Sequence, residues 1–444
     1  MASKRKKQTA MEGKKEKSGQ KKLQKMIRDF IHSAYEKARR KDRFNSIFRK
    51  CPKVGDEELF YLCVFRAMGQ FKSGRAFLQN LFLKDEKLAR ASFFEALQSP
   101  RRAAVSARIF NEAFEMFEKL SLESGTDFLR GFPELNDYAV FNGDGHYISH
   151  SVHAVSGGGR KYAAGSIYIQ NLRTGNLLPF CVVRDGRRRK HEMPYFRREV
   201  EGLSSSFYGH PKTLWILDMA YIDNPWWGRQ RKKGHYTISK LKSNVRPIKC
   251  GQIPYDRDDP INKGVTDCYY AGMNCGWAFR VVEYTNPETG EEFSFVTSLD
   301  GDFRPGLVAW LYFKRWNIEK NFDTTKTTME ETKAWGSGKG ALSIQSHAIA
   351  FAYNMMRLLH EIIIREQKER GNGETLSERK YRKDLEKRKE KANSVGRELH
   401  PLLWAVRMAR LPSAFVRCFQ SCFFKNIPLR RTGVLLTGTL YYQL

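Results

Sequence analysis

The spacing of hydrophobic residues divides the chain into a helical first part and a strand-rich middle part. From residue 21 to about residue 130 the apolar positions recur mostly at helical spacing, and Ser99 followed by Pro100 is typical of a helix start. Beyond residue 130, short runs of β-forming residues alternate with glycine-bearing turns, and one helix is expected at 193–203. Strands, then a helix, then a further apolar strand predict a mixed α/β fold in which helices pack on a sheet. The first four strand-forming runs are 137–150, 161–172, 177–185 and 213–222.

The strand-rich part continues to about residue 298 and ends in a predicted hairpin. Its arms are WAFRVVEY and EEFSFVTSL, and the connecting letters TNPETG favour a turn. A helix is expected next, with an apolar stripe made by Leu307, Leu311, Ile318 and Phe322. A buried helix around HAIAFAYNMMRLLHEIII follows it, and residues 366–399 are charged and expected to be helical or disordered.

The charge balance points to a polyanionic partner. The chain of 444 residues has 78 Lys and Arg against 48 Asp and Glu, which gives a net charge of +30. An excess of this size favours nucleic acid first and an anionic membrane surface second. The membrane interpretation is weak, because no apolar run reaches the roughly 18 residues that indicate a spanning helix. The eight cysteines include no Cys-x-x-Cys pair and indicate reduced, mostly buried thiols.

One stretch, YFKRWNIEKNFDTTK, combines charge with helical spacing. On a single helix, four of its residues would project within an arc of about 60°: Tyr312, Arg315, Glu319 and Lys326. A carboxylate between two cations and a phenol can belong to a solvated helix edge with ordinary ion pairing, or to a functional site. Spacing alone leaves both interpretations open.

Two aspartates are candidate partners for Glu319 if it binds a metal ion, because one carboxylate binds a divalent cation poorly. Asp144, in VFNGDGHY, follows an apolar strand run, and Asp218, in LWILDMAY, ends another. Open α/β sheets place their chemistry at the ends of strands. Asp-Gly is also a strong turn signal, so Asp144 can equally be a turn residue.

The order of these residues resembles a known family. An Asp on a first strand, an Asp on a later strand and a Glu on a downstream helix resemble the DDE catalytic core, which has a ribonuclease H-like fold. The spacing YxxRxxxExxxxxxK, which begins at Tyr312, matches the YREK signature of one large group of bacterial insertion-sequence transposases. The letters DGHY, LDMAY and RWNIE resemble the three catalytic regions of that group, and the resemblance covers roughly residues 135–360. Met219, Ala220 and His146 depart from the residues that the family usually has there.

The resemblance implies a DNA transposase that hydrolyses phosphodiesters and transfers strands with the help of divalent metal ions. Two Mg²⁺ ions are expected, which Mn²⁺ can replace. The implied catalytic and metal-binding residues are Asp144, Asp218 and Glu319. The implied DNA contacts within the signature are Tyr312, Arg315 and Lys326.

The segment NPWWGRQRKKGH offers further candidate DNA contacts. Its basic residues are expected to touch phosphates, although a solvated charge run is the alternative: Arg229, Arg231, Lys232 and Lys233. Members of the family often flip a base onto a tryptophan, and Trp226 is the candidate here, with Trp227 and Trp277 as alternatives. Ordinary packing is the competing interpretation for each tryptophan.

The expected organisation has four regions. A disordered basic tail at 1–20 precedes a helical DNA-binding domain at 21–130. A ribonuclease H-like DDE catalytic domain follows at 131–365, with a β-rich insertion at about 224–298, and a charged segment with a C-terminal helical region occupies 366–444. The expected partners are double-stranded DNA, as terminal inverted repeats and target, and a second copy in a homodimeric synaptic complex, with no membrane. The expected location is the bacterial cytoplasm, in association with the nucleoid. Two other functions stay open: a catalytically inactive DNA-binding protein descended from a transposase, and a DNA nuclease on the same fold.

Overall fold

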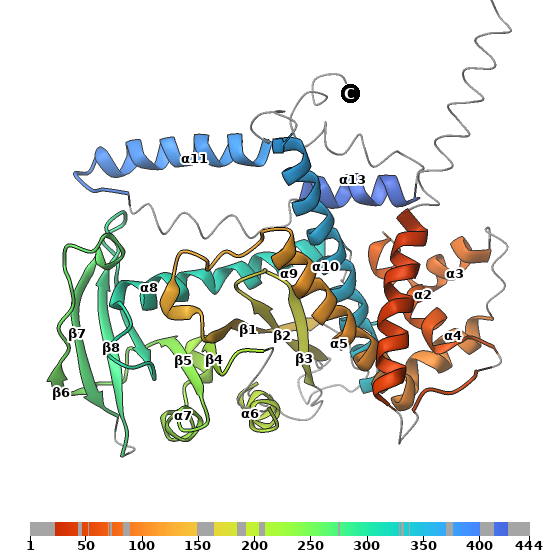
Figure 1. The fold of residues 1–444 in the computed structure, drawn as a ribbon, viewed down its shortest axis with the longest axis horizontal. Coiled ribbons are helices and arrows are strands. Elements are labelled where there is room, and N and C mark those ends of the chain that lie inside the picture. The colour runs from red at the N-terminus through yellow and green to blue at the C-terminus, as the bar shows by residue number, and fades with distance from the viewer. Residues whose placement is uncertain are drawn as a thin grey trace, which may run out of the picture.

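The strands form one nine-stranded sheet in the order β3-β2-β1-β4-β5-β9-β8-β7-β6, which reaches from the middle of the molecule to the edge where β6 and β7 lie (Figure 1). The structure is a computed structural model, and it describes residues 23–42, 47–51, 53–69, 71, 73–82, 89–148, 164–183, 192–203, 209–273, 276–327, 329, 333–336, 338–369, 376–399 and 413–424. The expected basic tail at 1–20 lies outside these residues. The domain boundaries stay predictions.

The first five strands have the arrangement of a ribonuclease H-like core. They are β1 Tyr138–Ile148, β2 Ala164–Asn171, β3 Leu177–Val183, β4 Lys212–Ile216 and β5 His235–Lys240. β1, β2 and β3 form an antiparallel meander, whereas β4 pairs parallel with β1 on one side and with β5 on the other. The predicted mixed α/β fold with a ribonuclease H-like core is confirmed.

Four further strands extend the sheet between Asp218 and Glu319. They are β6 Ile248–Gln252, β7 Val265–Gly272, β8 Ala278–Thr285 and β9 Glu292–Thr297. All are antiparallel to their neighbours, and β9 joins them to β5. The β-rich insertion and its β8–β9 hairpin are confirmed. The range expected for the insertion, 224–298, also contains β5, whose parallel pairing with β4 makes it a core strand.

Helices cover both faces of the core sheet. Successive strand residues point to opposite faces, and the core strands carry apolar side chains on both. On one face, Phe196 of α6 Met193–Glu201 and Trp226 of α7 Asn224–Arg231 pack in the same buried cluster as Trp215 of β4. On the other face, α8 Pro305–Lys314 packs in a cluster with Val140, Leu214 and Ile216. Even-numbered residues of β1 and β4 therefore point to the side of α8, and α9 Trp316–Thr327 follows α8 in the chain.

The long helix α10 Lys339–Glu369 joins the sheet to the first part of the chain, as Figure 1 shows. It contacts β3 on one side and α5 and α2 on the other, and Phe351 lies edge-on against Phe60 and Phe117. Ser99 caps α5 through the N–H of Arg102, as expected. The helical first part comprises residues 23–41, α2 Asp56–Met68, α3 Gly74–Phe82, α4 Arg90–Gln98 and α5 Pro100–Glu123.

Two helices follow α10 among the described residues. The charged segment is helical over α11 Leu376–Asn393, and α13 Ser413–Phe424 returns to the N-terminal helices, where Phe423 contacts Phe65. Within the described ranges, no helix combines the length and the apolar character that crossing a membrane requires.

Candidate active site

Asp144 and Asp218 lie side by side on neighbouring parallel strands. β1 and β4 pair in register as far as Asn142 with Ile216, and each aspartate follows two residues beyond that pair. Neighbouring strands are about 4.8 Å apart, so the register alone brings the two carboxylates close together. Asp144 itself lies inside β1 and pairs with Tyr168 of β2. The alternative that its Asp-Gly sequence forms a turn is therefore wrong.

The helix that carries Glu319 is interrupted at Arg315. The expectation of one helix through the whole YFKRWNIEKNFDTTK stretch is wrong, because α8 ends at Lys314 and α9 begins at Trp316. The N–H of Arg315 donates to the carbonyl of Tyr312, and the N–H of Ile318 donates to the carbonyl of Arg315. Both bonds reach back three residues instead of four, which tightens the chain locally.

The guanidinium group of Arg315 contacts all three predicted catalytic carboxylates. Its Nη1 lies 2.8 Å from Oε1 of Glu319 and 3.5 Å from Oδ2 of Asp144. Its Nη2 lies 4.0 Å from Oδ1 of Asp218. The Arg315 side chain is 7% exposed, whereas the carboxylate side chains are 25%, 35% and 41% exposed in the order Asp144, Asp218 and Glu319. Residues from β1, from the end of β4 and from α9 thus surround one buried cation and stay open to solvent.

Negative charge exceeds positive charge in this cluster. Burial raises the pKa of Asp144 to about 6, and the nearby carboxylates of Glu192 and Glu319 also raise it. The Arg315 guanidinium and the N–H of Gly145 lower the same pKa without cancelling the rise. A carboxylate that is costly to ionise beside other carboxylates is stabilised by added positive charge.

The donor set suits a hard divalent cation, because such ions take carboxylate oxygens as ligands. Within the described ranges, no three His, Cys, Asp or Glu side chains are close enough together to ligate one ion as they stand. Arg315 lies among the three carboxylates instead. A metal ion would therefore compete with this guanidinium for the same oxygens.

The other two residues of the YREK spacing occupy different surroundings. Tyr312 is buried, its ring lies 5.1 Å from that of Phe295, and its hydroxyl hydrogen-bonds with Arg315. It therefore supports Arg315 from the core side in this structure. Lys326 is exposed on α9, and burial together with its charge lowers the pKa of His146 to about 3.

The basic residues predicted after Asp218 lie at the end of α7 and just beyond it. Arg229, Lys232 and Lys233 are exposed, and Arg231 forms an ion pair with Asp300. These exposed side chains are accessible to a large ligand.

The tryptophans differ sharply in accessibility. Trp226 and Trp227 are fully buried, and the indole N–H of Trp226 donates to Glu201 at 3.0 Å, which fits the packing interpretation of both. Trp277 is partly exposed, its ring lies against Gly228, and the Lys232 ammonium is 5.1 Å from the ring centroid.

Sequence reasoning missed two polar residues that support the cluster. Asn142 lies two residues before Asp144 on the same strand face. The two-residue period of a strand predicts this shared face, so the sequence contained a signal for Asn142. Glu192 accepts a hydrogen bond from the Tyr221 hydroxyl and lies against Gly145. No local sequence pattern indicates a role for Glu192, because Glu192 is distant from β1 in the sequence and meets it only in the folded protein.

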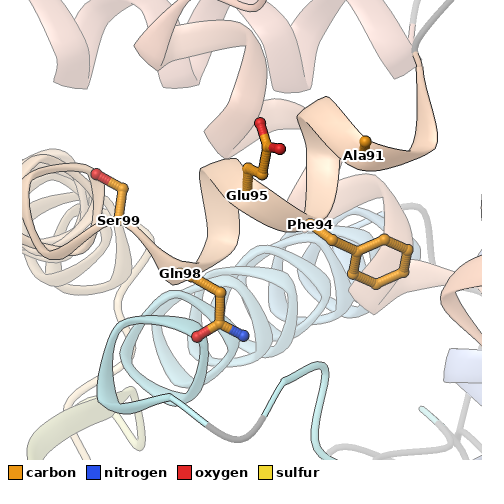
Figure 2. A pocket seen from close by; sticks show the side chains of 5 residues that line it. All are labelled: Ala91, Phe94, Glu95, Gln98 and Ser99. Atoms are coloured by element: carbon orange, nitrogen blue, oxygen red, sulfur yellow. The ribbon is translucent and has the colours of Figure 1, made fainter.

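A separate hollow lies on the N-terminal helices and carries little chemistry. Its lining follows one side of α4 and consists of Ala91, Phe94, Glu95, Gln98 and Ser99 (Figure 2). Glu95 is the one titratable residue of these five. The acidic cluster at β1 and β4 therefore remains the candidate active site.

Comparison with known proteins agrees with this geometry. Residues 156–355 match the family model described as the transposase DDE domain. The matched range includes Asp218, Arg315 and Glu319, and it begins after Asp144. No curated protein matches the chain. The chain therefore carries a transposase DDE domain, from a family that generally uses divalent metal ions and acts on DNA.

Proposed function

We propose that this protein is a DNA transposase that binds the ends of an insertion sequence and catalyses metal-dependent hydrolysis and transfer of DNA strands. The observation that carries the proposal is the convergence of Asp144, Asp218 and Glu319 on one guanidinium group. The match to the transposase DDE domain supports the same reaction class.

The three carboxylates are the proposed ligands for Mg²⁺, with Mn²⁺ as a substitute. A pair of divalent ions supplies a nucleophile at neutral pH, neutralises the scissile phosphate and stabilises the leaving oxygen. The protein's part is to hold Asp144 and Asp218 in register on rigid strands and Glu319 opposite them on α9. Their partial exposure leaves room for a phosphodiester that approaches from solvent.

Arg315 has two tasks in this proposal. Without metal it supplies the positive charge that keeps the three carboxylates together. With DNA present, the same guanidinium is placed to bind the phosphate beside the reacting bond, and Tyr312 orients it through their hydrogen bond. Lys326, exposed on the same helix as Glu319, is a second phosphate contact.

The exposed residues of α7 extend the proposed DNA contacts. Arg229, Lys232 and Lys233 bind the DNA backbone electrostatically, whereas Arg231 is partly neutralised by Asp300. Trp277 replaces Trp226 as the proposed base-stacking residue, because it is the more exposed of the two and has a lysine over its ring. Joining two transposon ends requires two active sites, so a homodimer is the proposed synaptic form.

The test uses purified full-length protein, Mg²⁺ and a supercoiled plasmid that carries the DNA flanking the gene. Wild-type protein is expected to nick the plasmid and to produce joined strands. Asp218→Asn is expected to lose about a thousandfold or more in rate, because several kcal/mol of transition-state stabilisation disappear. Asp258→Asn, which changes an exposed loop carboxylate, is the matched control and is expected to cleave as wild type does.

The other outcomes identify the competing functions. Nicking without any strand joining would indicate a nuclease on the same fold. DNA binding without nicking by the wild-type protein would indicate a catalytically inactive descendant of a transposase.

A further inference from the structure

We infer that Asn142 is a positioning residue whose side-chain amide holds the break between α8 and α9, and thereby holds Arg315 and Glu319 opposite Asp144. The consequence for metal binding rests on the proposed function. The contacts of Asn142 themselves do not depend on it.

Asn142 is fully buried and reaches across to the place where the helix is interrupted. Its Nδ2 lies 3.4 Å from the carbonyl oxygen of Lys314 and 3.3 Å from that of Arg315. The third acceptor is Oε1 of Gln170, at 3.3 Å. The last carbonyls of a helix have no partner within that helix, and a buried carbonyl needs a donor. Asn142 supplies that donor from a strand 172 residues earlier in the sequence.

The break needs a tertiary cause because its own sequence provides none. The letters KRWNI, from Lys314 to Ile318, contain neither proline nor glycine, which are the usual local causes of a sharp kink. A side chain that bonds to the carbonyls of the helical ladder is another recognised cause. The amide of Asn142 is such a side chain, so this contact, and not the local sequence, explains why α8 stops at Lys314.

The position of Asn142 links this break to the acidic cluster. Asn142 and Asp144 are two residues apart in β1 and therefore point to the same face of the sheet. The carbonyl that Asn142 binds belongs to Arg315, whose side chain contacts Asp144 and Glu319. One strand thus carries both Asp144 and the amide that fixes the break at Arg315, and α9 beyond that break supplies Glu319.

Asn354 provides a matched comparison within the same chain. It is also fully buried, and its amide exchanges two hydrogen bonds of 2.8 Å with the backbone of Leu177. These bonds tie α10 to β3, and they involve none of the carboxylates around Arg315. A substitution at Asn354 therefore reports the cost of losing a buried amide without disturbing the break.

The experiment compares Asn142→Leu, the near-isosteric Asn142→Asp and Asn354→Leu with the wild type, all as full-length protein. Amide hydrogen exchange without metal follows the N–H of Ile318, and calorimetric titration measures the Kd for Mn²⁺. Both Asn142 variants are expected to lose protection at Ile318, and Asn142→Leu, which adds no charge beside Asp144, is expected to raise the Kd at least tenfold. Asn354→Leu is expected to keep wild-type values of both. Asn142→Asp keeps the shape of the side chain, so it serves if Asn142→Leu does not fold.

Two results would overturn the inference. In the first, the Asn142 variants keep wild-type protection at Ile318 and a wild-type Kd. In the second, Asn354→Leu raises the Kd as much as Asn142→Leu does. Failure of the proposed function looks different, because the wild-type protein itself would then bind no Mn²⁺. In that case the exchange data still decide whether Asn142 holds the break.

Discussion

Two clusters of carboxylate, arginine and amide groups differ in how completely their charges are matched. In the first, Glu118 of α5 is partly buried and accepts hydrogen bonds from Thr174 at 2.7 Å and from Asn176 at 2.8 Å, beside the guanidinium of Arg357. In the second, three partly exposed carboxylates share the single guanidinium of Arg315. The first cluster is saturated with donors, whereas the second has a surplus of negative charge.

This difference separates a structural role from a functional one. The donors around Glu118 come from the β2–β3 turn, so the cluster ties α5 to the sheet and needs nothing more. Burial raises the pKa of both Glu118 and Asp144, but in the Arg315 cluster the nearby carboxylates of Glu192 and Glu319 raise the pKa of Asp144 further, whereas the donors around Glu118 lower its pKa. Surplus charge that is open to solvent is an arrangement that a divalent cation and a phosphate can complete.

The largest expected effect on stability lies in the saturated cluster. Glu118→Ala leaves the buried donors of Thr174 and Asn176 without their acceptor, and we expect it to lower the free energy of unfolding by about 3–4 kcal/mol. Chemical denaturation measures this change. Glu115→Ala, on the exposed side of the same helix, is the control and is expected to cost less than about 1 kcal/mol. Equal losses in both variants would remove the contrast between the two clusters.

A smaller effect of opposite sign is expected for Asp144→Asn. The folded protein holds the proton of Asp144 up to about pH 6, whereas an unfolded Asp releases it near 3.8, so stability falls as pH rises through this window. The cost is complete at neutral pH, and the neutral amide avoids it. We expect metal-free Asp144→Asn to be more stable than the wild type by about 1–2 kcal/mol at pH 7 and by less at pH 4. Thermal unfolding at the two pH values measures this, and a destabilised variant at pH 7 would contradict the surplus-charge account.

The smallest expected effect concerns Lys314, a buried lysine that precedes Arg315 in the sequence. Burial lowers its pKa to about 7, and its ammonium lies 4.0 Å from the centroid of the Trp310 ring. An unfolded lysine keeps its proton up to about pH 10, so wild-type stability should rise with pH between the two values. Lys314→Met removes the buried charge together with its contact to the ring, which offsets part of the gain. We expect the variant to be more stable by about 1 kcal/mol at pH 6.5, with a smaller difference at pH 9.5.

Denaturation curves of Lys314→Met and of Lys320→Met, whose side chain is 40% exposed, provide the measurement and its control. A pH-independent difference at Lys314 would show that its charge is not the cause.

Much of the fold follows from local sequence. The β-rich runs and the turn letters between them predict β1, β2, β3, β4 and the β8–β9 hairpin, because strand propensity and turn chemistry are local properties. The neighbouring positions of Asp144 and Asp218 follow from the parallel register of β1 and β4, although Asp144 lies inside its strand and Asp218 follows the end of its own. The family resemblance supplied Glu319 as their partner.

The remaining features depend on contacts between distant parts of the chain. Helical spacing treats the segment around Arg315 as one helix, because the amide that interrupts it belongs to Asn142. Helical spacing also predicts that Tyr312 lies at the edge of the buried helix face, whereas in the structure packing against Phe295 buries it. For the same reason a local motif could not distinguish the buried Trp226 from an exposed aromatic.

The most direct test of the central claim is a crystal structure of the full-length protein with Mn²⁺, with anomalous diffraction used to locate the ion. The account predicts an anomalous peak in contact with Asp144, Asp218 and Glu319, with the guanidinium of Arg315 displaced from between them. Arg315 still bridging the three carboxylates at saturating Mn²⁺, with no peak among them, would contradict it.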